Sequence, residues 1–220
     1  MTIGEWKNAL GLPLALLLCG VLFDAAAFAY PPLALTAAND LRMRLFRLAR
    51  VAAIALPLLA LFFSDLAGRA GTESATARRG GRAMVFGAVA MPIVLIAAAL
   101  TRLEIRLLLP LPAIAVFFAA ASAASLARRH AGLLEFSGWR LIAASTAAGL
   151  VMGLYAFDTP FVPNFAGPYD GLFRALIRRA HEGAIVSGMA LIVLSGALEK
   201  KGVAHENRTD RDRRRQIANA

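Results

Sequence analysis

The sequence has 220 residues, of which 59% are hydrophobic, and it carries a formal net charge of +10. Its mean hydropathy of +0.62 is above that of a soluble domain of ordinary composition, so the chain is predicted to be a membrane protein. The arginines flank apolar runs, where they anchor helix ends, so the charge does not indicate a nucleic-acid partner. The single cysteine, Cys19, excludes an intramolecular disulfide and a cysteine-based metal site.

Six apolar runs are long enough to form transmembrane helices, because about 20 residues cross a hydrocarbon core of about 30 Å. They cover residues 9–29, 51–67, 83–100, 107–126, 141–157 and 183–198. The predicted fold is therefore an all-α transmembrane bundle of about six spans, in a single membrane domain over residues 1–199. Residues 200–220 are charged at both signs and nearly free of apolar residues, which predicts a disordered cytoplasmic tail.

The first apolar run also has the shape of a signal peptide. Its apolar core is followed by Ala27-Phe28-Ala29, which fits a small-x-small cleavage pattern. Two interpretations stay open here. If the segment is retained, Asp24 is a costly intramembrane carboxylate and a candidate functional residue. If the segment is removed, Asp24 has no role in the mature protein.

The links between the spans are predicted from their composition. Residues 33–50 contain LRMRLFRLAR, with leucines on one side and arginines over the rest, which predicts a basic helix on the membrane surface. Residues 68–82 are small, polar and basic, which predicts a flexible loop. Only residues 101–106 join the third and fourth spans, so these two spans are expected to form an antiparallel hairpin.

Small residues at four-residue spacing predict close packing between the last two spans. Ser145, Gly149 and Gly153 form such a stripe in the fifth span, and Gly183 and Ser187 begin another in the sixth. Helices in membranes approach closely where small residues meet. We therefore expect the fifth and sixth helices to pack tightly against each other.

The last span is predicted to continue a helix that begins outside the membrane. Prolines and glycines between residues 158 and 171 predict an extramembrane loop. Asp170 then offers an N-cap for a helix that runs without a break into the sixth span. Arg174, Arg178 and His181 follow at i, i+4 and i+7, so they are expected on one face of this helix at the membrane edge.

The distribution of basic residues predicts the orientation. With six spans, the segments on the side of the two termini carry 15 Lys and Arg, and the segments on the other side carry 9. This count favours an inner-membrane protein with both termini in the cytoplasm. The arginines of residues 42–50 run against the rule.

Six polar residues are predicted to gather at the outer face and to bind a ligand. They are Asp24, Asp158, Arg174, Arg178, His181 and Glu182. Arginine side chains suit a phosphate or a carboxylate, so the expected ligand is an anionic or lipid-like small molecule. A further interpretation makes His181 and Glu182 a proton-handling pair. The alternative to that pair is that Glu182 pairs with Arg178 or Arg179 on its own helix and that His181 faces lipid headgroups.

No catalytic residue is assigned. The sequence lacks GxSxG, HExxH, P-loop and dinucleotide motifs. No serine in the spans is expected to meet a histidine at its depth, which argues against a Ser/His hydrolase. His130 and His181 begin consecutive spans and are expected on opposite sides of the bilayer, which argues against shared haem or metal ligation. We therefore predict no cofactor and no metal site, and the chain is not expected to be an enzyme.

Two functions follow from these observations. The leading hypothesis is a small inner-membrane protein that binds or transports an anionic or lipid-like small molecule through the outer-face cluster. The alternative is a non-catalytic subunit or assembly factor of a larger membrane complex. The expected partners are the lipid bilayer, an anionic lipid or small molecule, and other membrane subunits or further copies of the chain. A membrane enzyme acting on a lipid headgroup ranks third.

Overall fold

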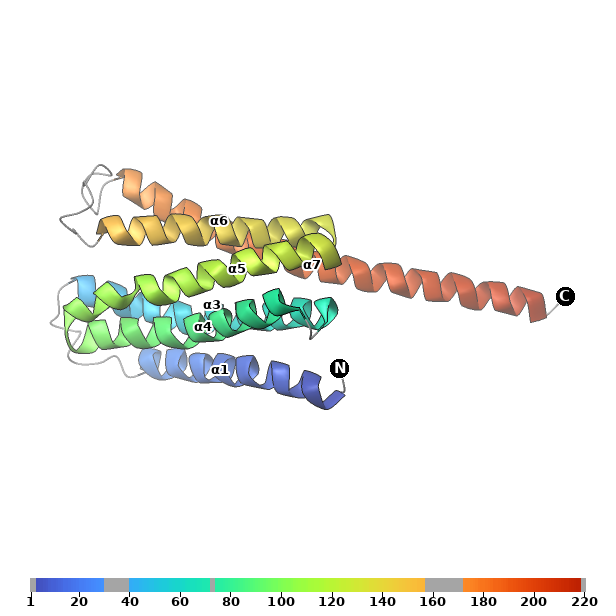
Figure 1. Cartoon of the computed structure of the whole chain (residues 1–220), viewed down its shortest axis with the longest axis horizontal. Coiled ribbons are helices and arrows are strands. Elements are labelled where there is room, and N and C mark those ends of the chain that lie inside the picture. The colour runs from blue at the N-terminus through green and yellow to red at the C-terminus, as the bar shows by residue number, and fades with distance from the viewer. Residues whose placement is uncertain (1–2, 30–39, 72–73, 157–171, 219–220) are drawn as a thin grey trace.

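The computed structural model describes residues 3–29, 40–71, 74–156 and 172–218, with side chains described over 11–29, 41–71, 74–151, 172 and 175–199. Within these ranges the chain is an all-α bundle without a strand, as the sequence predicts (Figure 1). In chain order the elements are α1 (Ile3–Ala29), α3 (Asp40–Ala70), α4 (Ala75–Leu100), the 3-10 helix η1 (Leu103–Leu108), α5 (Pro110–His130), α6 (Leu133–Ala156) and α7 (Leu172–Ala218).

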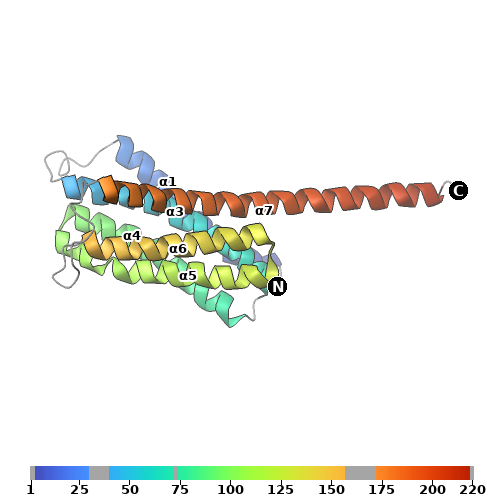
Figure 2. The same cartoon turned by 90° about the horizontal axis from the view of Figure 1, so that it is seen from above.

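The described chain runs back and forth as a multi-pass membrane protein. Five helical segments are long and apolar enough to cross a membrane, namely α1, α3, α4, η1 with α5, and α7. The first half of α6 is less apolar because it contains Glu135 and Arg140, and the predicted fifth span begins only after them. Both views show α6 running alongside the spanning helices (Figure 2). We therefore count α6 as the sixth helix of the bundle.

The two ends of the bundle differ in what they contain. At one end lie the amino end of α1, the links between α3 and α4 and between α5 and α6, and the point where α7 leaves the bundle (Figure 1). This end is called the exit end below. The opposite end holds η1, which joins α4 and α5 as the predicted antiparallel hairpin, and is called the η1 end.

The prediction of a basic surface helix over residues 33–50 is wrong for the part that the structure describes. Asp40–Ala70 forms one continuous helix, so the arginine-rich segment is the first part of a spanning helix. Leu45 and Phe46 are buried in the core. Arg42 donates to the carbonyl oxygens of Ala99 and Thr101, which are left without partners where α4 ends. Of the leucines that would face lipid on a surface helix, Leu41 and Leu45 pack here against other helices, whereas Leu48 is exposed.

The flexible loop predicted over residues 68–82 is also wrong for most of its length. α3 extends to Ala70 and α4 begins at Ala75, where the Ser74 side chain accepts a hydrogen bond from the backbone N–H of Ala77. Gly80, one of the glycines on which the loop prediction rested, lies inside α4 and leaves space for the ring of Phe63 on α3. A Cβ on Gly80 would lie 2.7 Å from Cζ of Phe63. Glycine here serves close helix packing and does not break the helix.

α7 runs unbroken from Leu172 to Ala218, so the predicted continuation of the interfacial helix into the last span is confirmed. The helix also includes residues 200–218, which the sequence predicts as a disordered tail, and it extends past the exit end of the bundle (Figure 2). No proline interrupts this segment, and its lysine, glutamate, arginine and alanine residues favour helix. A segment that cannot build a core can still continue a helix that has already begun.

The core is built largely from alanine, which lets the helix axes approach closely. Among its alanines without exposed surface are Ala98, Ala99, Ala119, Ala120, Ala123 and Ala127. Larger side chains fill the region where α3 meets α6. There the rings of Phe63 and Trp139 lie edge to face with centroids 6.3 Å apart.

The predicted close packing of the last two spans is confirmed for α6 and α7, although two glycines outside the predicted stripes bring the backbones closest together. A Cβ on Gly138 would lie 2.6 Å from the carbonyl oxygen of Gly188, and a Cβ on Gly188 would lie 2.8 Å from that of Gly138. Gly183 has nothing within 4 Å of such a Cβ, and Ser187 is exposed. The helices therefore touch through a different face of α7 from the one expected.

Candidate functional site

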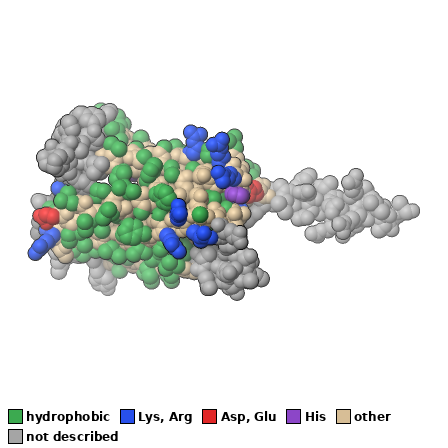
Figure 3. All heavy atoms as spheres, viewed as in Figure 1, with side chains coloured by type: hydrophobic (Ala, Val, Ile, Leu, Met, Phe, Trp, Pro, Cys, Tyr) green, Lys and Arg blue, Asp and Glu red, His purple; other side chains and the backbone are tan. Residues whose placement is uncertain are grey.

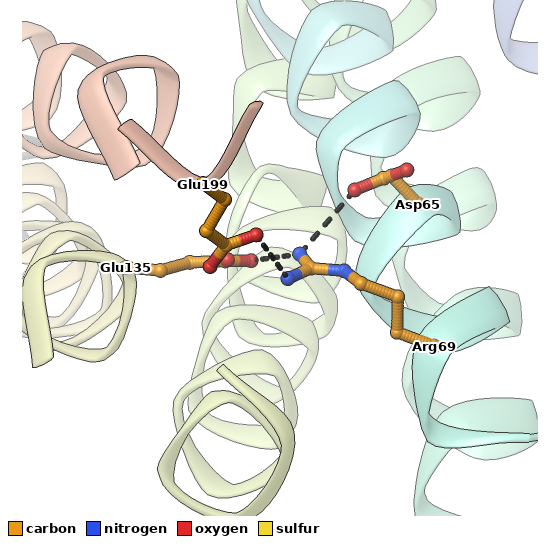
Figure 4. A network of polar contacts seen from close by, with 4 residues as sticks. All are labelled: Asp65, Arg69, Glu135 and Glu199. Carbon is orange, nitrogen blue, oxygen red and sulfur yellow. Dashed lines mark hydrogen bonds and ion pairs between the residues drawn. The ribbon is translucent and has the colours of Figure 1, made fainter. Parts of the chain in front are cut away.

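Four charged side chains meet where α3, α6 and α7 come together at the exit end (Figure 4). Arg69, in the last turn of α3, donates from Nη2 to Oε1 of Glu135 on α6 at 2.5 Å. The same nitrogen lies 3.3 Å from Oδ2 of Asp65, one turn earlier on α3. Nη1 lies 3.9 Å from Oε2 of Glu199 on α7. One guanidinium is therefore shared by carboxylates from three helices.

The three carboxylates around Arg69 differ in burial, and so their ion pairs differ in strength. The side chain of Glu135 is 3% exposed, whereas those of Asp65 and Glu199 are 54% and 50% exposed. A buried carboxylate costs several kcal/mol of desolvation and stays charged only with a partner such as Arg69. Glu135 also lies in the first turn of α6, where the helix dipole favours a negative charge. The pair of Arg69 and Glu135 therefore contributes most to holding this junction together.

The sequence carries only part of the signal for this junction. In a six-span topology its four residues all fall near the same side of the membrane. Asp65 and Glu199 lie at the ends of apolar runs, as ordinary boundary residues do. Glu135 comes before the predicted fifth span, so the pattern suggests a solvated residue, whereas α6 already begins at Leu133 and buries it.

A second polar contact joins α6 to α7 at His181. The ring atom Nδ1 of His181 lies 2.9 Å from the Oγ of Ser145 and 2.7 Å from the backbone oxygen of Ser145. The Oγ of Ser145 also lies 2.9 Å from the backbone oxygen of His181. The expectation that no serine in the spans meets a histidine is therefore wrong.

The geometry of these hydrogen bonds shows where the protons lie. A carbonyl oxygen only accepts, so Nδ1 of His181 must carry the proton that it donates to the backbone of Ser145. The Ser145 hydroxyl then donates to the backbone oxygen of His181. A serine nucleophile would need its proton directed at an unprotonated ring nitrogen, which is not the arrangement here. This Ser–His contact holds two helices together and does not activate the serine.

Gly149 provides the space for the imidazole of His181. A Cβ at this position would lie 2.5 Å from Cε1 and 3.1 Å from Nε2 of the ring. Gly149 therefore does lie at the interface between α6 and α7, as predicted. Its role is to accommodate a side chain, whereas Gly138 and Gly188 bring the two backbones together.

Asp24 has a different partner from those predicted. Nε of Arg50 on α3 donates to Oδ1 of Asp24 on α1 at 2.6 Å, and the two side chains are 26% and 36% exposed. One turn away, Gly20 of α1 lies directly against the backbone of Ala53 on α3. α1 packs mainly on α3, whereas α7 packs on α6. The expected convergence of Asp24 with the residues of α7 is therefore not found.

The other predicted ligand residues are divided between local contacts and undescribed positions. Glu182 forms an ion pair with Arg179 at 3.0 Å on its own helix, which is one of the two pairings expected as the alternative to a proton-handling pair with His181. Arg178 is half-buried and also interacts within the protein. Asp158 lies outside the described residues, and so does the side chain of Arg174.

Neither metal-binding groups nor similarity to known proteins assigns a function to the described chain. Over the residues that the structure describes, no group of three or more histidine, cysteine, aspartate or glutamate side chains could hold a metal ion. His130 is exposed at the carboxyl end of α5, at the exit end. No protein-family model matches the chain, and comparisons with curated proteins and with solved structures find no match. The class that the fold and these contacts define is a multi-pass helical membrane protein.

Proposed function

We propose that this protein is a non-catalytic subunit or assembly factor of a larger membrane complex. The observation that carries the proposal is that the predicted ligand residues with described side chains form contacts within the protein. Asp24, Arg178, His181 and Glu182, the four with described side chains, all interact with other groups of the same chain. Asp24 and His181 each join two helices, and Glu182 pairs on its own helix, which favours a rigid membrane scaffold over a ligand path through the outer-face cluster.

The outer helices of the bundle support the same proposal. In the apolar windows of α1 and α7, 17% of the residues are buried, against 39–44% in the windows of α3, α4 and α5. Both helices therefore offer broad apolar faces to lipid or to other membrane helices. α7 is 47 residues long, which is about 70 Å at 1.5 Å per residue, or more than twice the thickness of the hydrocarbon core. Such a helix can hold a partner at a fixed distance from the membrane.

The test is the native mass of the full chain purified in mild detergent, compared with a variant that ends after residue 200. We expect the full chain to carry a second protein at fixed stoichiometry, and the shortened chain to lose it while keeping the same unfolding temperature. A full chain that contains only copies of itself, together with binding of an anionic ligand that Arg178→Gln abolishes, would reject the subunit proposal.

We also propose an inner-membrane location with both termini in the cytoplasm. The count of basic residues supports this orientation, and the positions of the two termini beyond the same end of the bundle agree with it (Figure 1). A topology reporter fused after Lys201 should be active only in its cytoplasmic form, and one inserted at Asn164 only in its exported form. The reverse pattern would contradict the orientation.

One observation favours binding of an anionic or lipid-like small molecule as a second candidate function. Because Nδ1 of His181 is occupied inside the protein, Nε2 is the ring nitrogen left to accept a hydrogen bond from a ligand. Arg178 lies one turn earlier on α7. A screen of anionic compounds by thermal shift would support this candidate if a compound raised the unfolding temperature of the wild type but not of Arg178→Gln.

A further inference from the structure

Two neighbouring helices of the bundle contain arginine but no acidic residue. α4 contains Arg78, Arg79 and Arg82, and α5 contains Arg128 and Arg129. Neither helix has an aspartate or a glutamate. α6 adds Arg140, and the glutamate of α6 is already paired with an arginine of α3. The five exposed arginines Arg79, Arg82, Arg128, Arg129 and Arg140 are called the arginine collar below.

The members of the collar lie close to one another at the exit end. α4 and α5 are antiparallel, and a Cβ on Gly80 of α4 would lie 2.8 Å from the Cβ of Ser122 on α5. The first turns of α4 therefore lie beside the last turns of α5, and only two residues separate the end of α5 from the start of α6. Figure 3 shows several basic side chains toward the exit end of this face and mainly hydrophobic side chains over its middle.

Most of the described arginines toward the η1 end have partners within the described chain, although the exposed Arg47 and Arg102 do not. Arg42 binds backbone carbonyls, Arg50 pairs with an aspartate and Arg179 with a glutamate. Three others also interact within the chain, namely Arg44, Arg106 and Arg178. In the collar, Arg79, Arg82, Arg128 and Arg129 have no hydrogen bond or ion pair with any part of the chain that the structure describes. These four side chains are therefore not engaged by the described part of the chain.

The collar continues the faces of the helices that are turned toward lipid. On α4, Arg82 is followed at helical spacing by the exposed side chains of Phe86, Val89 and Ile93. On α5, the exposed stripe of Leu111, Ile114 and Phe118 reaches Arg129 at the exit end in the same way. An arginine at the end of a lipid-facing apolar stripe lies at the level of the lipid headgroups.

Arg140 supports this placement from inside the apolar zone. Its guanidinium carbon lies 5.4 Å from the centre of the Phe136 ring, which is one turn closer to the exit end. The side chain therefore extends toward the headgroup level, as long basic side chains do when their backbone lies below the interface.

We propose that the arginine collar binds the headgroup phosphates of anionic phospholipids in the leaflet at the exit end. The planar guanidinium can donate two parallel hydrogen bonds to a phosphate. In a zwitterionic headgroup the choline charge offsets the phosphate, whereas phosphatidylglycerol keeps a net negative charge. A cluster that lies mainly on two helices without acidic residues therefore favours the lipid with the net negative charge. This surface is separate from the contacts that carry the proposed function.

The experiment is a lipid titration of the detergent-purified full chain by native mass spectrometry, with phosphatidylglycerol and phosphatidylcholine as probes. We expect phosphatidylglycerol to bind more tightly. Each arginine near an anionic lipid surface contributes a factor of about five in affinity, so Arg82→Gln with Arg129→Gln should weaken phosphatidylglycerol binding about 25-fold. Phosphatidylcholine binding should change little, and the circular dichroism spectrum should show that the variant remains folded.

Arg47→Gln with Arg102→Gln is the matched control, because it removes two exposed arginines that lie toward the η1 end. It should weaken phosphatidylglycerol binding less than about threefold. Equal losses in the two double variants, or equal binding of the two lipids by the wild type, would overturn the proposal. Stabilisation by inorganic phosphate alone that is lost with Arg82 and Arg129 would assign the collar to a soluble anion and would also overturn it.

Discussion

Removing the charge of Arg69 should destabilise the protein far more than removing any one of the carboxylates around it. In Arg69→Gln, the carboxylate of Glu135 would remain 97% shielded from solvent without an opposite charge. Breaking a buried ion pair from one side costs about 3–5 kcal/mol. Because the side chain of Arg69 is itself 31% exposed, water can reach part of the site, and we expect a value near 3 kcal/mol.

Substituting the carboxylates around Arg69 should lower the free energy of unfolding by less, because Arg69 keeps other partners. In Glu135→Gln, the amide oxygen can still accept from Arg69, and the guanidinium keeps two other carboxylates within 4 Å. We expect a loss of about 1 kcal/mol, the typical value of one hydrogen bond. Glu199→Gln removes an exposed and longer contact and should cost less than about 1 kcal/mol.

These differences can be measured by equilibrium unfolding in mixed micelles of a mild detergent and dodecyl sulfate, followed by far-ultraviolet circular dichroism. Trp139, one turn from Glu135 and without exposed surface, reports the local packing in the near ultraviolet. The double variant Arg69→Gln with Glu135→Gln should be more stable than the sum of the single effects by about 2 kcal/mol, as coupled neighbours are. An Arg69→Gln variant no less stable than Glu199→Gln would refute the reasoning.

Two further predictions concern the other interhelical contacts. Gly149→Ala should displace the histidine imidazole and lower the free energy of unfolding by about 1–3 kcal/mol, whereas Gly183→Ala, with open space around it, should leave it unchanged or raise it by up to about 1 kcal/mol. Equal effects in thermal unfolding would contradict this assignment. In double-mutant cycles, Asp24→Asn should couple with Arg50→Gln by about 1 kcal/mol and should add to Arg178→Gln within about 0.5 kcal/mol. Coupling to Arg178 instead would show that α1 and α7 meet.

The contacts of α6 and α7 show how an error of a few residues in a helix boundary hides a site. The pattern starts the fifth span at residue 141 and the sixth at residue 183, which leaves His181 outside the membrane and Ser145 near the opposite surface. In the structure, Ser145 lies about three turns before the end of α6 and His181 about three turns after the start of α7. The two residues therefore share a depth. Hydropathy shows which part of a helix is apolar but not where the helix begins and ends. When a helix extends into polar sequence, the depth of its residues in the membrane differs from the depth that the apolar segment alone predicts.

Fold class and most of the spanning helices of the described chain were readable from the sequence alone, because apolar length against bilayer thickness is a property of each segment by itself. The unbroken entry of α7 into its span was readable for the same reason. The partners of the polar residues were not. Asp24 could be recognised as costly in a membrane, but its pairing with Arg50 depends on which helices are neighbours and on the rotation of each about its axis. The burial of a charged Glu135 likewise depends on its pairing with Arg69, which lies 66 positions earlier in the chain. Those rotations are set by how alanines and glycines of several helices fit together at once, and only the tertiary structure contains that information.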